Sequence, residues 1–142
     1  MTSIARYVNV SVIGIEYPGY GIYKGNGSAS EKKLKEDAEY VYKFCLKDMG
    51  IKESEIIVFG RSMGGGPASF LAGNFSPRAL SLMSTYTSVS DAAGNLSMFV
   101  TERFRNIDEV AKATCPTFIV HGRQDTVIPW SHGEALYNAS AG

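Results

Sequence analysis

The stretch that decides the fold reads IIVFGRSMGGG, from Ile56 to Gly66. Its first four residues are β-branched or aromatic, and such a run predicts a short buried strand. A Gly-x-Ser-x-Gly sequence follows at once at residues 60–64, and the small residues beyond it can begin a helix. The sequence therefore predicts a sharp strand-to-helix turn that lifts the Ser62 side chain to the rim of a sheet.

This arrangement is typical of a nucleophile elbow, in which the serine is held in a strained backbone conformation of positive φ. We expect side chains at positions 60 and 64 to collide across so tight a turn, which explains two glycines there. The turn would also aim the backbone N–H of Met63 at a developing oxyanion, near the positive end of the next helix. The alternative is a glycine-rich turn with a capping serine. A phosphate-binding loop is excluded because Gly-Lys-Ser/Thr is absent.

The composition is that of an ordinary globular domain. The chain has 142 residues, a formal net charge of +0 and 44% hydrophobic residues, which predicts a single domain over residues 1–142. The balanced charge gives no reason to expect a nucleic-acid partner. No signal peptide or membrane-spanning run is visible, so we expect a cytoplasmic protein. Cys45 and Cys115 lack metal or redox spacing, and no metal or cofactor is expected.

Strand-like and helix-like segments alternate along the chain. The predicted strands cover Val8–Glu16, 56–59, 79–83 and 116–120. The predicted helices cover 29–49, with Ser28 and Glu31 as a capping box, the residues after Gly64, 107–112 and 131–140. This order predicts an α/β fold with a mostly parallel sheet of about four strands flanked by helices. The irregular segment 84–105 is either a cap that accepts an acyl chain or a packed connection.

A serine hydroxyl needs a base to accept its proton and an acid to orient that base. Asp125 follows a late strand at the sheet edge where Ser62 lies, which makes it the candidate acid, with a solvated turn residue as the alternative. Asp91 is a weaker candidate for the same role. The only histidines are His121 and His132. We expect His121 to be a structural residue and His132 to begin a helix that points away, so neither is predicted to be the base.

Four stretches carry a resemblance to a known family: EYPGYG at 16–21, GRSMG at 60–64, IDEV at 107–110 and HGRQDTVIP at 121–129. With these residues, nearly the whole chain resembles the α/β-hydrolase superfamily. Within it, the chain is most similar to the membrane-associated protein depalmitoylases and the Bem46-like hydrolases. The elbow and the His-Gly-x-x-Asp stretch are specific for the superfamily and only suggestive of this branch.

The resemblance implies a serine hydrolase that acts on esters or thioesters without a metal or cofactor. Ser62 would be the nucleophile, Asp125 the triad acid and the Met63 N–H an oxyanion donor. The implied substrate is a small molecule or an acylated protein, including S-acylated proteins at membranes, and the full-length protein is expected to be membrane-associated.

The chain also departs from the family pattern, as if truncated at both ends. Family members place another strand between the counterparts of Val8–Glu16 and the elbow strand, and they end with a strand and the catalytic histidine. Val8–Glu16 must therefore slide across to the elbow strand or leave backbone groups unpaired. Losing the base costs several orders of magnitude and losing an oxyanion donor about a hundredfold, so little activity is expected. The second hypothesis is a non-catalytic, hydrolase-like binding protein.

Overall fold

The computed structural model describes residues 2–24, 30–93 and 104–142. Its sheet consists of β1 (Ile57–Arg61), β2 (Ala79–Met83) and β3 (Thr117–Val120), which pair in parallel in the order β1-β2-β3. The α/β class and the parallel sheet are confirmed, because helices connect these strands as crossovers. The described sheet has three strands, one fewer than the sequence predicted.

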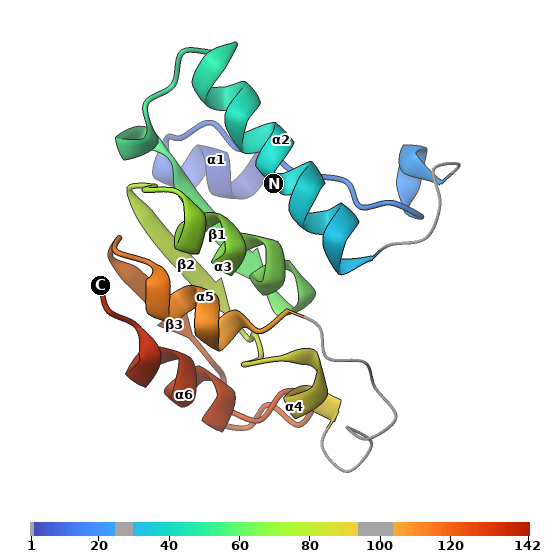
Figure 1. The fold of residues 1–142 in the computed structure, drawn as a ribbon, viewed down its shortest axis with the longest axis vertical. Coiled ribbons are helices and arrows are strands. Elements are labelled where there is room, and N and C mark those ends of the chain that lie inside the picture. Colours follow the sequence, from blue (N-terminus) through green and yellow to red (C-terminus); the bar gives the residue numbers. More distant parts are fainter. Residues whose placement is uncertain (1, 25–29, 94–103) are drawn as a thin grey trace.

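Six α-helices surround the sheet in the described residues: α1 (Thr2–Val8), α2 (Glu31–Lys47), α3 (Gly65–Asn74), α4 (Val89–Ala93), α5 (Asn106–Lys112) and α6 (Ser131–Ala139). Short 3-10 turns lie at Gly21–Tyr23, Glu53–Glu55 and Ser62–Gly64. Figure 1 shows α3, α5 and α6 on one side of the sheet and α1 on the other. None of the described helices is long and apolar enough to cross a bilayer.

The predicted helices at 107–112 and 131–140 are confirmed to within one residue as α5 and α6. The helix predicted over 29–49 is confirmed as α2, but it begins later. Its N-cap is Ser30, whose hydroxyl accepts a hydrogen bond from the Lys33 N–H at 3.2 Å, so the capping box predicted from Ser28 is wrong. In the segment 84–105, α4 is described, and residues 94–103, a part of the predicted cap, lie outside the described residues.

The strand predicted at Val8–Glu16 is wrong. Val8 ends α1, and residues 9–16 form no strand and have exposed side chains, with Val10 46% and Ile13 51% exposed. The segment neither slides across to β1 nor pairs elsewhere, because β1 pairs with β2 alone in the described sheet. A strand needs a partner for its backbone groups, and without one the apolar alternation does not suffice.

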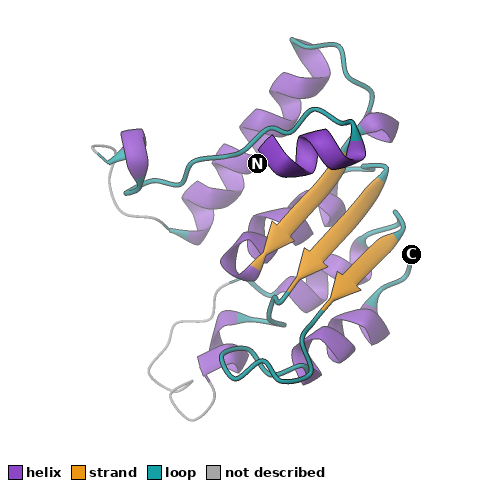
Figure 2. Cartoon of the chain, turned by 180° about the vertical axis from the view of Figure 1, so that it is seen from behind, coloured by secondary structure: helices purple, strands orange, loops and turns teal. Residues whose placement is uncertain are grey.

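The main core lies between the sheet and the helices of one face. Val58, Leu80 and Leu82 point from the strands toward this face and pack with residues of α3, α5 and α6 that include Leu71, Ala72, Val110 and Leu136. Figure 2 shows the opposite face, where α1 lies near the beginnings of the strands. Because all three strands are parallel, their carboxyl ends lie along the same side of the sheet, which is called the sheet edge from here on. The loops that follow the strands begin at this edge.

The crossing of β1 and α3 depends on the absence of a side chain at Gly60. A Cβ atom there would lie 2.5 Å from the Gly64 carbonyl oxygen and 2.7 Å from the Ala68 Cβ. At Gly64 the nearest atom would be the Tyr17 hydroxyl at 3.5 Å, and the backbone has ordinary helical angles (φ −63, ψ −16). The predicted collision is therefore confirmed for position 60 and wrong for position 64.

These two glycines make a matched pair for a stability test. We expect Gly60→Ala to lower the free energy of unfolding by about 1–3 kcal/mol, because the new methyl group overpacks the contact between β1 and α3. Gly64→Ala should stay within about 0.5 kcal/mol of the unsubstituted protein. Urea denaturation followed by circular dichroism measures both. Equal stability of the two variants would contradict this account of the turn.

Candidate active site

Ser62 lies at the C-terminal end of β1, directly before α3. Its backbone has φ 51, the positive value that the motif predicts, although it is not a glycine. Such a conformation costs about 1–3 kcal/mol and persists only where the surroundings impose it. Ser62 is exposed, and its hydroxyl forms no hydrogen bond with any described residue. The hydroxyl is therefore open to an incoming molecule at the sheet edge.

The backbone next to Ser62 supplies the candidate oxyanion donor. Met63 belongs to the 3-10 turn Ser62–Gly64 that leads directly into the first turn of α3. Helix N-termini carry a partial positive charge and unpaired N–H groups. An N–H in this position is suited to stabilise negative charge on an oxygen held beside the Ser62 hydroxyl.

Asp125 lies in the loop after β3, at the same edge of the sheet. Its Oδ1 accepts hydrogen bonds from the backbone N–H groups of Ile128 and Val127, both at 2.9 Å. These bonds, led by that of Ile128, hold the pKa of the carboxyl below its usual range, so it is a carboxylate at neutral pH. Since β2 separates β1 from β3, the two strands that lead to Ser62 and Asp125 lie about 10 Å apart, or two strand spacings.

His121 follows β3 and is held by the Asp125 loop. Its Nε2–H donates to the Ile128 carbonyl oxygen at 2.8 Å, and its Nε2 lies 3.9 Å from the Asp125 Oδ2. The other side of the ring faces Gly133, where a Cβ atom would lie 2.8 Å from Nδ1. Its side chain is 6% exposed. The imidazole thus shapes the loop, in agreement with the structural role expected for it.

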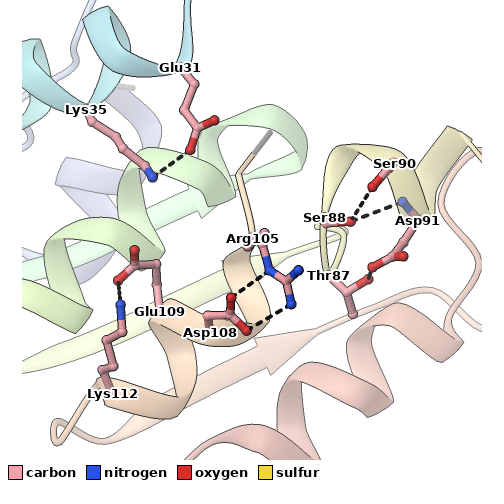
Figure 3. A network of polar contacts seen from close by, with 10 residues as sticks. All are labelled: Glu31, Lys35, Thr87, Ser88, Ser90, Asp91, Arg105, Asp108, Glu109 and Lys112. Atoms are coloured by element: carbon pink, nitrogen blue, oxygen red, sulfur yellow. Dashed lines mark hydrogen bonds and ion pairs between the residues drawn. The ribbon is translucent and has the colours of Figure 1, made fainter. Parts of the chain in front are cut away.

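His132 lies near the start of α6, as expected, but its ring faces the chain that follows β2. The Thr87 N–H donates to the His132 Nδ1 at 3.3 Å, and the Thr87 Oγ1 lies 3.0 Å from the same nitrogen. The Thr87 hydroxyl donates to the Asp91 Oδ2 at 2.7 Å (Figure 3). Asp91 is therefore connected to His132 through Thr87, which gives it a partner other than Ser62.

Asp91 is also fixed by the start of its own helix. The Ser88 Oγ accepts from the Asp91 N–H at 3.1 Å, and Figure 3 shows Thr87 and Ser88 grouped around Asp91. The hydrogen bonds from Thr87 and then Ser88 lower the pKa of the Asp91 carboxyl. Its contacts are explained by helix capping, which leaves Asp125 as the acid candidate at the edge shared with Ser62.

Sequence reasoning overlooked the hydroxyl-bearing residues at 84–88. Thr85 is 1% exposed, and its Oγ1 donates to the Ser62 carbonyl oxygen at 2.6 Å. A cluster of hydroxyl side chains directly after a predicted buried strand could have indicated them, because that position faces the elbow across the sheet edge. Within the described residues, no group of three or more His, Cys, Asp and Glu side chains could hold a metal ion.

Comparison with known proteins identifies relatives and solved structures of the same fold. No protein-family profile matches the sequence. The chain is 33% identical over 132 residues to the human "Alpha/beta hydrolase domain-containing protein 17B" and 32% identical over 133 residues to "Alpha/beta hydrolase domain-containing protein aho-3" of Caenorhabditis elegans. Each match covers 92% of this chain, which spans 45% and 40% of the two relatives, so less than half their length.

Solved structures share the fold. An esterase domain from Rhodothermus marinus matches with a TM-score of 0.54 and 17% identity, over 72% of this chain and 52% of that one. A puromycin-hydrolyzing peptidase from Mycobacterium tuberculosis matches with a TM-score of 0.62 and 18% identity, over 77% of this chain and 19% of the other. These similarities concern the fold, a parallel sheet connected by helices. The chain belongs to the α/β-hydrolase superfamily, as the sequence indicated.

The contacts of His132 predict a pH dependence of stability. Burial lowers the pKa of its imidazole below the ordinary value of about 6.5, although the Asp91 carboxylate opposes this shift. The unfolded chain then binds the proton more readily, so stability falls as the pH drops through 6.5 toward the lower native pKa. We expect His132→Asn, which keeps an acceptor for the Thr87 N–H, to lose less stability between pH 7 and pH 5.

Urea denaturation at pH 7, 6 and 5 measures this difference. Carboxylates are shared by both proteins and contribute equally to the change of stability with pH. The difference between the two proteins therefore isolates the contribution of His132. Parallel stability curves for the two proteins would show that folding leaves the pKa of His132 unchanged.

Proposed function

We propose that the chain is a serine hydrolase that cleaves esters or thioesters through an acyl-enzyme on Ser62. The observation that carries the proposal is the strained backbone of Ser62, φ 51, at an exposed position at the end of β1. A serine that only capped a turn would have no need for this conformation, which costs about 1–3 kcal/mol. The strain favours the nucleophile over the capped turn.

Each of the three candidate residues would have a separate role in the reaction. The Ser62 Oγ forms a bond to the acyl carbon while the C–S or C–O bond to the leaving group breaks, and the hydroxyl proton passes through a base to that group. Water then attacks the acyl-enzyme, which releases a carboxylic acid and restores the serine. The Met63 N–H donates to the oxyanion in both steps, and the Asp125 carboxylate orients the base.

For the substrate we propose the thioester of an S-acylated protein. The support is the resemblance of EYPGYG at 16–21 and HGRQDTVIP at 121–129 to the protein depalmitoylases. Such substrates carry long acyl chains and lie at membranes, so a membrane-associated substrate is part of the proposal. A small-molecule ester would meet the same chemical requirements at Ser62.

The base is the component that the described contacts do not provide. The chain has two histidines, and each is engaged elsewhere, His121 with the Ile128 carbonyl and His132 with Thr87. The strands that lead to Ser62 and Asp125, β1 and β3, lie about 10 Å apart with β2 between them, and a base side chain would bridge the two residues. We therefore expect slow chemistry that a base from solution accelerates.

Labelling with a fluorophosphonate probe tests this expectation. The 142-residue protein should label slowly at pH 7, and free imidazole should raise the rate in proportion to its concentration, because it can reach the exposed Ser62 and accept the proton. Ser62→Ala should abolish labelling at every imidazole concentration. Circular dichroism of both proteins confirms that the comparison is made between folded chains.

Two results would count against the proposal. Labelling that persists in Ser62→Ala would place the reaction on another residue. A folded protein that stays unlabelled even with imidazole would favour the second candidate, a non-catalytic binding protein. The observation in favour of that candidate is the engagement of both imidazoles by Ile128 and Thr87.

A further inference from the structure

We propose that Thr85 is a positioning residue that aims the oxyanion donor, by holding the peptide group between Ser62 and Met63 in one orientation. This inference rests on the proposed function, because it assigns a role at the same site. It is carried by one hydrogen bond across the sheet edge, from the Thr85 Oγ1 to the Ser62 carbonyl oxygen at 2.6 Å.

The geometry of the peptide bond connects this contact to the reaction. The Ser62–Met63 peptide is planar and trans, so its C=O and N–H bonds point in opposite directions. A donor that fixes the direction of the Ser62 C=O therefore also fixes the direction of the Met63 N–H. Since Thr85 is buried and Ser62 is exposed, we expect the N–H of Met63 to point away from the interior, toward the sheet edge.

Close packing restricts the orientation of the Thr85 side chain. Its side chain is 1% exposed, and a Cβ atom on Gly65 would lie 1.9 Å from its Oγ1. The hydroxyl thus occupies space that a glycine at the start of α3 leaves open. The Ser62 carbonyl also accepts from the Gly65 N–H within the turn, so the two donors clamp it from the helix and from the chain after β2.

This clamp also explains how a non-glycine residue keeps a positive φ. A strained conformation persists where several contacts over-determine it, and Gly65 alone supplies a bond that any such turn could form. The contact from Thr85 comes from a residue 23 positions away, beyond the reach of local backbone preference. The tertiary contact is what distinguishes this turn from an ordinary one.

Two substitutions at Thr85 separate hydroxyl chemistry from packing. Thr85→Val keeps the shape and removes the donor, whereas Thr85→Ser keeps the donor and removes a methyl group. If the hydroxyl orients the donor, the imidazole-stimulated rate of fluorophosphonate labelling should fall by about ten- to a hundredfold in Thr85→Val. Thr85→Ser should stay within about threefold of the unsubstituted protein. The loss should appear in the maximal labelling rate, with the half-saturating probe concentration unchanged.

A second measurement does not depend on catalysis. The residual dipolar coupling of the Met63 amide, measured in a weakly aligned sample, reports the direction of its N–H bond. We expect this coupling to change in Thr85→Val and to be preserved in Thr85→Ser, with the couplings of β1 and β2 unchanged in both. If Thr85→Val does not fold, Thr85→Cys, whose thiol is only a weak donor, replaces it and should behave as Val does.

The outcomes distinguish the two proposals. An unlabelled parent protein whose Met63 coupling still changes in Thr85→Val would remove the proposed function and leave the positioning role in place. A Met63 coupling that is the same in Thr85→Val would overturn the role of Thr85. If Thr85→Val keeps the labelling rate and Thr85→Ser lowers it, the role of Thr85 is in packing alone.

Discussion

The close approach of β1 and α3 at Gly60 is the constraint on which the rest of the structure depends. Because position 60 carries no side chain, the carbonyl of Gly64 and the methyl of Ala68 can lie against the strand. The chain then has to reverse within a few residues, and Ser62 takes the positive φ that the reversal requires. Strain at Ser62 is the local cost of packing α3 directly on the sheet.

That reversal places Ser62 at a sheet edge where other loops already converge. The carboxyl ends of three parallel strands meet there, so residues that follow β2 and β3 come near the elbow whatever their distance along the chain. Thr85 donates to the elbow itself, and Asp125 is held as a carboxylate by two backbone N–H groups. The edge thus combines a strained serine, a polar support and a fixed negative charge.

The two histidines show that the residue type alone does not determine the role of a side chain. Both lie near this edge, and both belong to a fold in which an imidazole commonly serves as the base. His121 uses its Nε2–H to hold the Ile128 carbonyl, and His132 receives the N–H of Thr87. Their described hydrogen bonds serve loops and helix starts, and none of these bonds connects either imidazole to Ser62.

The local sequence by itself determined most of the secondary structure of this protein. The apolar runs, the spacing of the glycines after Phe59 and the helical periodicities predict β1, β2, β3, α2, α3, α5, α6 and the position of Ser62, because strand, turn and helix preferences act over a few neighbouring residues. Only the tertiary structure decided the rest. Val8–Glu16 has strand-like alternation and forms no strand, since no neighbouring strand pairs with it. The partners of Thr85 and His132 lie 23 and 45 residues away, and contacts at that separation depend on how the whole chain packs.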